Sequence, residues 1–328
     1  MPPAGVFEKA QAVTRFAVLS TMKNEGAFLL EWVAHHKALG FDDLVICTND
    51  CADGTDAMVL RLQALGLARH HETLKAGTSI QRAAFRQVRA LPEVAAADWL
   101  WVCDADEFLV VHVGDGSVSA LVAAGSEGVE VISVPWRVFG PGGHLGYEDA
   151  PVSGQFVQAE RAARRGEGKP VFAKSLMRDP GKVGRIGVHA PLPPEGAAPY
   201  LREAPGGRPV RAGQPMMVRA RYDVAQVNHY ALRSAESFLV KCDRGRVNHV
   251  GEDMGLEYWR RFDLAEVECQ GIRRHDAAAG AWRARLLADA ELAALHGAAV
   301  AWHRARIAAL KADPAMSVLW SAIAERVA

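Results

Sequence analysis

Three acidic residues, Asp104, Asp106 and Glu107, interrupt an otherwise apolar stretch that begins at Trp99. An unpaired carboxylate in apolar surroundings costs several kcal/mol, so some partner must neutralise these groups. Residues i and i+2 of a strand point to the same side, so the two aspartates can converge on one point. A divalent cation between them would remove their repulsion and would also bind phosphate oxygens. Helix capping or pairing with an arginine are the structural alternatives.

The first third of the chain predicts the elements that position these acids. Apolar runs alternate with helical periodicity, which favours an α/β fold with a parallel sheet and right-handed crossovers. The predicted strands are 16–21, 44–48 and 98–108, and the helices between them end at Gly40, Gly66 and Pro92. Ligands of such sheets bind beyond the carboxyl ends of the strands. We therefore expect residues 21–25, 49–54 and 104–107 to share one rim.

Beyond residue 112 the pattern changes to short strands and then to helices. The predicted strands are 129–135, 154–160, 170–177 and 224–232, and the predicted helices are 234–245, 254–267, 279–288, 289–311 and one after Pro314. Residues 191–213 are too long for an ordinary connection, which indicates either a functional loop or an insertion.

Composition excludes several classes of protein. The 328 residues contain 38 basic and 38 acidic side chains, so no global charge recruits nucleic acid. The five cysteines include one close pair, Cys47 and Cys51, which lacks the second pair of a zinc site, and reduced thiols are expected. No run of 18 apolar residues predicts a transmembrane segment, so we expect a cytoplasmic protein. The Ala-rich helices could form a dimer or touch a membrane surface, and the oligomeric state stays open.

Several ordered motifs resemble the glycosyltransferase family 2 superfamily of GT-A fold, in particular its branch resembling family 92. They are "KNEGAFLLEWVAHHKALGFDDLVICTNDCADGTD", "DWLWVCDADEFL", "WRVFGPGGH" and "NHYALRSAESFLVKCDRG". The resemblance implies a Rossmann-like, mostly parallel central sheet flanked by helices. It covers residues 14–246, with a nucleotide-binding half (14–112) and an acceptor-side half (113–246). An N-terminal tail (1–13) and a helical C-terminal extension (247–328) fall outside it.

The resemblance also implies a reaction. A sugar would move from a nucleotide-diphosphate donor, expected to be a UDP-sugar, to a glycan or another hydroxyl acceptor, with inversion. Mn²⁺ or Mg²⁺ held by the D-x-D would stabilise the departing diphosphate. Asp106 would bind this metal directly, Asp104 would reach the ribose or the metal through water, and His229 would be a further ligand, with His189 as its alternative.

Donor recognition is predicted for polar residues near the same rim. The nucleotide-binding candidates are Thr21, Lys23, Asn24, Glu25, Asp53, Gln81, Arg82 and Asp104, and the diphosphate candidates are Lys241 and Arg244. Each has a structural alternative: Asn24 is a favoured helix cap, Gln81 and Arg82 suit a solvated helix face, and cations suit a helix C-terminus.

The resemblance to an inverting enzyme also implies a catalytic base. Inversion needs an Asp or Glu that deprotonates the acceptor hydroxyl, and Glu148 and Asp149, with His144 before them, are the candidates. Trp136 and Phe139 could stack on an acceptor sugar or belong to the core.

Two other functions stay open. A protein of this fold that binds nucleotide or carbohydrate without catalysis would keep these motifs but not the base. A metal-dependent phosphohydrolase or nucleotidyltransferase could also use paired aspartates, although residues 20–26, "STMKNEG", form neither a P-loop nor a G-x-G-x-x-G motif.

Overall fold

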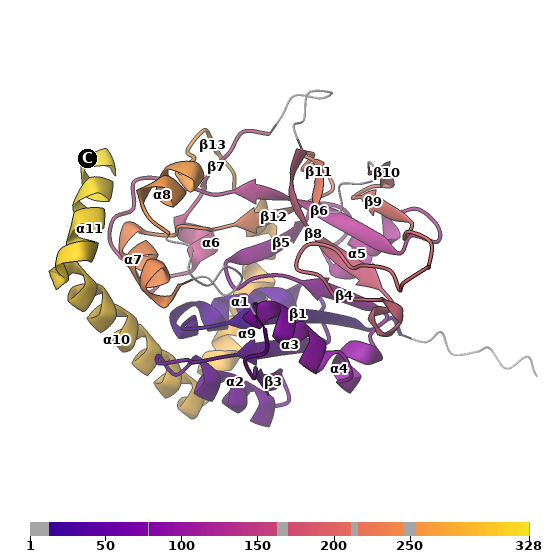
Figure 1. The fold of residues 1–328 in the computed structure, drawn as a ribbon, viewed down its shortest axis with the longest axis horizontal. Helices are drawn as coiled ribbons and strands as arrows, with labels where there is room; N and C mark the ends of the chain where they lie inside the picture. Colours follow the sequence, from indigo (N-terminus) through magenta and orange to yellow (C-terminus); the bar gives the residue numbers. More distant parts are fainter. Residues whose placement is uncertain (1–12, 78, 163–169, 211–215, 246–253, 328) are drawn as a thin grey trace, which may run out of the picture.

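The computed structural model describes residues 13–77, 79–162, 170–210, 216–245 and 254–327. These residues form an α/β molecule with a curled central sheet, helices on its faces and further helices at the C-terminal end (Figure 1). The predicted N-terminal tail, apart from Val13, lies outside the described residues.

The first part of the sheet is parallel, as predicted. Strand β1 (Phe16–Met22) lies between β2 (Asp43–Thr48) and β4 (Trp99–Val102), and both neighbours run parallel to it. A further parallel strand, β3 (Arg69–Glu72), pairs with β2 at the edge. Its sequence, Arg-His-His-Glu, has no apolar pattern, and for this reason sequence analysis missed it. The helices of this part are α1 (Gly26–Ala38), α2 (Thr55–Ala64), α3 (Ile80–Val88) and α4 (Pro92–Ala95).

The later part of the sheet is mixed. Strand β8 (Pro170–Arg178) runs antiparallel between β4 and β6 (Val131–Val138). Strand β12 (Ala225–His229) pairs antiparallel with β5 (Glu107–Val111) and parallel with β6. The described part of the predicted long segment, residues 191–210, contributes two short strands: β9 (Arg202–Ala204), which pairs with β6, and β10 (Arg208–Pro209), which pairs with β9 at the edge of the sheet. The remaining short elements of this part are α5 (Val118–Ala123), α6 (Val152–Gln155), β7 (Gln158–Ala159), the 3₁₀ turn η1 (Pro180–Lys182) and β11 (Met217–Arg219). The strand predicted over 154–160 is wrong in its first half, because α6 occupies residues 152–155.

The D-x-D segment links the two parts of the sheet. Strand β4 ends at Val102 and β5 begins at Glu107, so Asp104 and Asp106 lie in the turn between them rather than within one strand. The Glu107 amide donates to the Asp104 carbonyl at 3.2 Å, which closes this turn. The convergence of the two aspartates therefore depends on a turn, and strand periodicity was the wrong reason to expect it.

The C-terminal helices pack onto the first part of the molecule (Figure 1). Helix α10 contacts α1, α2 and α7, and a Cβ built on Gly26 of α1 would lie 2.7 Å from the Ala299 Cβ of α10. Glycine at position 26 therefore permits this close helix approach. Arg61 on α2 also pairs with Asp289 at 2.6 Å. The C-terminal elements are α7 (Ala235–Arg244), α8 (Leu256–Phe262), β13 (Val267–Glu268), η2 (Gly271–His275), α9 (Asp276–Leu287), α10 (Ala290–Ala312) and α11 (Pro314–Val327).

The main core fills the space between α1, the sheet and α9–α10. His35 and His36 on α1 are buried in it, and Phe139 is a core residue as well. Within the described ranges no single helix has the length and apolarity to cross a membrane. Among the described helices, α10 and α11 meet this length and apolarity criterion only when they are taken together, and the two helices are bent by 96° relative to each other.

Candidate active site

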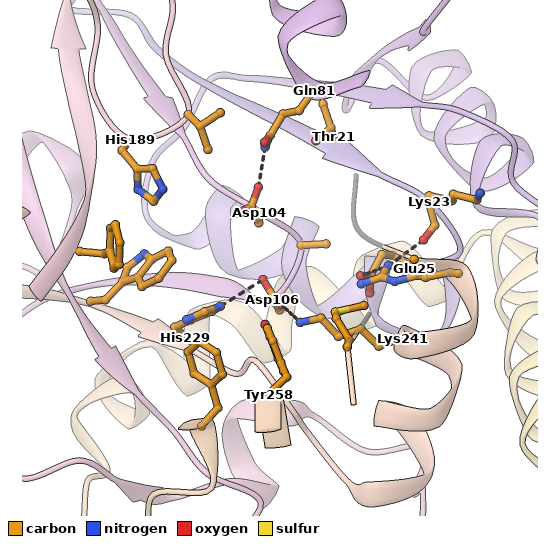
Figure 2. Close-up of a pocket in the computed structure, with 18 of the residues that line it drawn as sticks. Thr21, Lys23, Glu25, Gln81, Asp104, Asp106, His189, His229, Lys241 and Tyr258 are labelled. Carbon is orange, nitrogen blue, oxygen red and sulfur yellow. Dashed lines mark hydrogen bonds and ion pairs between the residues drawn. The ribbon is translucent and has the colours of Figure 1, made fainter. Parts of the chain in front are cut away.

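A cavity of about 620 Å³ lies around the D-x-D turn (Figure 2). It collects side chains from β1, α3, the β4–β5 turn, β6, β8, β12, α7 and α8. Eleven of the residues predicted to bind donor or metal line this cavity: Thr21, Lys23, Glu25, Gln81, Arg82, Asp104, Asp106, His189, His229, Lys241 and Arg244.

Both carboxylate oxygens of Asp104 are already engaged. The Gln81 Nε2 donates to Oδ1 at 2.6 Å, and the Lys174 Nζ donates to Oδ2 at 2.8 Å. Lys174 projects from the middle of β8, and its side chain is 0% exposed. Burial alone would raise the pKa of Asp104, but the attraction of Lys174 outweighs it and the net pKa is lowered. Asp104 is therefore held in position as an anion by one hydrogen bond to each of its oxygens.

Glu107 completes a buried cluster with Lys174. Its Oε2 lies 3.2 Å from the Lys174 Nζ and accepts the backbone amide of Asp104 at 2.8 Å. Burial raises the pKa of Glu107 to about 8, and Lys174 offsets this only in part. The contacts of its Oε2 with the Lys174 ammonium group and with the Asp104 amide anchor the turn.

Asp106 has a different environment. The Lys241 Nζ donates to its Oδ2 at 2.6 Å, whereas Oδ1 faces the His229 Nε2 across 3.9 Å (Figure 2). Burial opposes ionisation of Asp106, but Lys241 outweighs it and the pKa is lowered. Burial also lowers the pKa of His229 to about 4, so this imidazole is neutral at pH 7. Asp106 therefore keeps one oxygen that no lysine occupies.

Glu25 ties three segments together below the cavity. Its carboxylate pairs with Arg233 at 2.8 Å and, more closely, with Arg244. Arg244 also donates to the Lys23 carbonyl at 2.7 Å, and Arg233 donates to the Ala105 carbonyl at 3.1 Å. Burial would raise the pKa of Glu25, but the two arginines together lower it. The β1–α1 loop, the D-x-D turn and α7 are thus held in one arrangement.

The charges around the cavity do not cancel. Three carboxylates line the cavity: Glu25, Asp104 and Asp106. Five cations line it as well: Lys23, Arg82, Lys241, Arg244 and Arg261. Lys174 and Arg233 do not belong to the lining, but each pairs with one of these carboxylates. An anion is therefore the ligand that this part of the cavity favours.

Two predicted nucleotide contacts do not line the cavity. Asp53 accepts the Gly26 amide at 2.8 Å and the Thr55 amide at 2.9 Å, so its carboxylate holds the starts of α1 and α2. Asn24 accepts the Ala52 amide at 2.7 Å and has a φ of 52°, a left-handed conformation that asparagine tolerates. Both side chains are occupied in shaping the loops, which gives their predicted role in donor binding no geometric support.

The predicted base candidates also lie outside the cavity lining. His144 packs its ring against Phe156 at 5.3 Å, and Glu148 and Asp149 are exposed. Asp149 lies 3.5 Å from the His296 Nε2. Their catalytic role stays a prediction without a contact at the D-x-D turn.

The cavity has two unlike sides. We call Lys23, Glu25, Asp104, Asp106, Lys241 and Arg244 the charged wall. We call Trp136, Phe172, His189, His229, Tyr258 and Phe262 the aromatic wall. Figure 2 shows Asp104 and Asp106 between the Lys23–Glu25 side and the His189–His229 side.

Several residues that line or support the cavity were not predicted from the sequence. Phe172, Tyr258 and Phe262 gave no signal, because aromatic residues in a strand or helix usually indicate core. Lys174 did give one, since it interrupts the apolar strand "VFAKSLM" and a lysine is almost never fully buried without a partner.

The donor atoms near Asp106 offer a divalent cation only part of a coordination shell. The described residues contain no group of three or more His, Cys, Asp or Glu side chains placed to hold a metal. Asp106 Oδ1 and His229 Nε2 face each other, and the Nδ1 of His229 is buried without a hydrogen-bond partner. These two donors fit a cation that takes its other ligands from water or from a bound anion.

Comparisons with known proteins give partial alignments with solved structures and no family match. No protein-family model matches the chain, and no curated protein matches it. Among solved structures, S. aureus TarS 1–349 in complex with UDP aligns with 15% identity and a TM-score of 0.28, over 38% of this chain and 36% of that chain. Glucosyl-3-phosphoglycerate synthase from Mycobacterium tuberculosis, in complex with Mn²⁺, UDP and glucosyl-3-phosphoglycerate, aligns with 19% identity and a TM-score of 0.28, over 39% and 46%. The chain thus spans less than half of either protein, and a likeness at this level assigns no activity.

Proposed function

We propose that this protein is a glycosyltransferase that moves a sugar from a nucleoside-diphosphate donor to a hydroxyl acceptor. The observation that carries the proposal is the excess of five cations over three carboxylates in the lining of one cavity of about 620 Å³. That size lies in the range of small-molecule sites. The motifs that resemble glycosyltransferase family 2 and family 92 support a UDP-sugar as donor and inversion as outcome.

The charged wall would act on the diphosphate. In sugar transfer the bond between the anomeric carbon and the diphosphate oxygen breaks, and its electron pair leaves with the diphosphate. Lys241 and Arg244 are fixed by Asp106 and Glu25, and attraction to these carboxylates keeps the pKa of each cation raised despite burial. Cations held in place before the reaction stabilise the departing charge without reorganisation. Thr21, Lys23, Gln81 and Arg82 would contact the nucleoside.

We also propose a role for Mn²⁺ or Mg²⁺. Asp106 Oδ1 and His229 Nε2 would hold the ion, and the ion would supply positive charge at the leaving diphosphate. Each oxygen of Asp104 already accepts one hydrogen bond, so Asp104 would contact the ribose, or the metal through a water molecule, with its remaining lone pairs. His229 is preferred to His189 as the ligand because it faces Asp106 directly.

A second candidate function is nucleotide binding without transfer. The three carboxylates that line the cavity among the described residues, Glu25, Asp104 and Asp106, are all paired with cations, which leaves none of them free as a base. Slow hydrolysis of a UDP-sugar by the wild-type protein, measured as UDP release, would exclude this candidate. UDP binding with no release of UDP from any donor or acceptor tested would favour it.

The first experiment is a thermal-shift titration with UDP and Mn²⁺. A ligand that binds only the native state at about 100 times its Kd adds about 2.7 kcal/mol of stability, so Tm should rise by several degrees. Asp106→Asn should fold but lose the part of the shift that depends on Mn²⁺. Its turnover of a UDP-sugar should fall by about 100-fold or more, as when other transition-state contacts are removed.

Asp223→Asn is the matched control. Asp223 also pairs with an arginine, Arg208, but it does not line the cavity. This variant should bind UDP and Mn²⁺ like the wild type. A wild-type protein whose Tm does not move with UDP, GDP or another nucleoside diphosphate in the presence of Mn²⁺ would refute the proposed function.

A further inference from the structure

The aromatic wall has three rings in mutual contact that the proposed donor chemistry does not use. Trp136, Phe172 and His189 come from β6, β8 and the segment after η1, and their ring centroids lie 5.3 to 5.5 Å from one another. All three are half-buried and line the cavity. They are therefore partly open to a ligand in the cavity, whereas a core residue would be covered by protein.

These rings lie next to the reacting position. The Trp136 ring is 4.2 Å from the His229 ring, and the His229 Nε2 faces Asp106 across 3.9 Å. Figure 2 shows His189 and His229 on the side of Asp106 opposite Lys23 and Glu25. If a diphosphate occupies the charged wall, the side of the cavity with these rings remains available for the molecule that receives the sugar.

His189 offers one fixed hydrogen-bond acceptor among these rings. Its Nδ1 lies 2.9 Å from the Ala173 carbonyl oxygen, and a carbonyl can only accept, so Nδ1 carries the proton and donates. In the neutral ring the lone pair is then on Nε2, for which no described residue is a hydrogen-bond partner. The Ser175 hydroxyl donates to the His189 carbonyl at 2.7 Å and fixes the backbone at this position.

Aromatic faces beside a single acceptor atom match the chemistry of a pyranose, which has an apolar C–H face and a rim of hydroxyl donors. A small anionic acceptor would need cations here. Arg261 is the single Lys or Arg that the described part of β6, β8, β12 and α8 contributes to the cavity, whereas the charged wall holds Lys23, Lys241 and Arg244.

Building on the proposed function, we infer that Trp136, Phe172 and His189 of the aromatic wall form the acceptor subsite, that they pack on a neutral pyranose ring, and that the Nε2 of His189 accepts a hydrogen bond from one acceptor hydroxyl. On this inference the three rings and the charged wall bind different substrates. Donor and acceptor binding can be tested separately for this reason.

The test measures binding of neutral methyl glycosides in the presence of saturating UDP and MnCl₂. The probes are the methyl glycosides of glucose, galactose, mannose and N-acetylglucosamine. Saturation-transfer NMR detects their binding, and titration gives the Kd of each. Phe172→Leu keeps the bulk of the side chain but removes the ring face, and it should weaken binding of the best glycoside by about five-fold, as expected for a lost ring contact. His189→Leu should weaken it by a similar factor, and His189→Gln, which keeps an acceptor atom, by less.

Trp320→Leu on α11 is the matched control, since Trp320 is a half-buried aromatic residue that does not line the cavity. It should leave glycoside binding unchanged, and all four variants should keep the wild-type Kd for UDP within two-fold. The inference is overturned if no glycoside binds, if Phe172→Leu and His189→Leu bind the glycoside like the wild type, or if 3-phosphoglycerate binds more tightly than every neutral glycoside. Failure of UDP binding would refute the proposed function instead, and the response of the glycoside to Phe172→Leu would still decide this subsite.

Discussion

The two walls of the cavity are ordered by different forces. On the charged wall Glu25, Asp104 and Asp106 each have cationic partners within 3 Å, so that the wall is held by ion pairs before any ligand arrives. On the aromatic wall the contacts are ring packing, such as Trp136 against His229 at 4.2 Å. Fixed charges favour one kind of ligand at a set position, whereas ring faces accept apolar surfaces with less directional demand. If the proposed function holds, the cavity would be exacting toward the diphosphate of the donor and more tolerant toward the acceptor.

The largest expected effect is on the charged wall. Lys174→Met removes the buried ammonium group that Asp104 and Glu107 share. Breaking a buried pair by deleting one partner costs about 3–5 kcal/mol, and about 3 kcal/mol is expected here because the Asp104 side chain is 33% exposed. Urea denaturation of the metal-free protein measures this loss.

Two further variants make the Lys174 prediction specific. Lys182→Met removes a lysine that pairs with Asp179 on the surface, where its side chain is 82% exposed, and should cost less than about 1 kcal/mol. The double variant Lys174→Met with Asp104→Asn should be more stable than Lys174→Met alone, because the stranded charge is gone. A loss below about 1 kcal/mol for Lys174→Met would mean that ion pairing does not order this wall.

The same contrast explains how far sequence reasoning reached. Lys23, Asp104 and Asp106 follow strands of the parallel part of the sheet. There, hydrophobic periodicity predicts the strands, and ligands bind beyond the carboxyl ends of those strands. The structure brings these three residues to one cavity. Of the aromatic wall, Trp136, Phe172 and His229 come from the mixed part of the sheet. Phe172 reaches the cavity because β8 inserts antiparallel between β4 and β6, and local periodicity carries no information on such long-range pairing.

Two predicted roles show the same limit at the level of single residues. Asp53 stands in the predicted loop, but its carboxylate is used by the Gly26 and Thr55 amides. Glu148 and Asp149 have the right chemistry for a base, yet they are exposed and outside the cavity lining. Residue type and spacing identify candidate groups, but which hydrogen bonds a group has already made is decided by tertiary structure.

The walls should also titrate in different pH ranges. Burial lowers the pKa of His229 from 6.5 to about 4 in the folded protein, so the unfolded chain takes up this proton first. The free energy of unfolding therefore decreases as the pH falls from 6.5 towards 4, because His229 must stay neutral in the folded protein. This loss reaches about 2 kcal/mol at pH 5. The pKa values of Glu25, Asp104 and Asp106 are lowered, so their contribution is present above their ordinary values and is lost only as pH falls below about 4.

His229→Gln tests this separation. Urea denaturation in EDTA at pH 7, 6 and 5 should give the variant a flatter dependence on pH than the wild type, with the difference growing to about 2 kcal/mol at pH 5. His36 and His303 are also buried with pKa values lowered to about 4, but they are present in both proteins and cancel. Equal slopes in the two proteins would show that the aromatic wall does not set the acid sensitivity between pH 6.5 and 5.

A smaller effect on nucleotide affinity should distinguish the ligand of the charged wall from that of the aromatic wall. Lys241→Gln removes the cation that contacts Asp106, and it should raise the Kd for UDP by about ten-fold, or about 1.4 kcal/mol. UMP, which lacks the second phosphate, should lose less affinity. Phe172→Leu on the opposite wall should leave both values within two-fold. Isothermal titration with each nucleotide makes the comparison, and an equal loss for UDP and UMP would place Lys241 away from the diphosphate.

The smallest effect concerns the exposed edge of the cavity. Arg82 on α3 lines the cavity but is exposed, so its attraction for a bound anion is screened by water and salt. Arg82→Gln should raise the Kd for UDP by about three-fold or less at low salt, a loss typical of an exposed ion pair. In 0.5 M NaCl the variant and the wild type should bind UDP equally, because the screening length is then only a few Å, roughly 4 Å. The loss in Lys241→Gln should persist at this salt concentration, since Lys241 is only 16% exposed and salt screens buried pairs much less. If the two variants instead respond to salt alike, burial is not what distinguishes the cations of the charged wall from those at its rim.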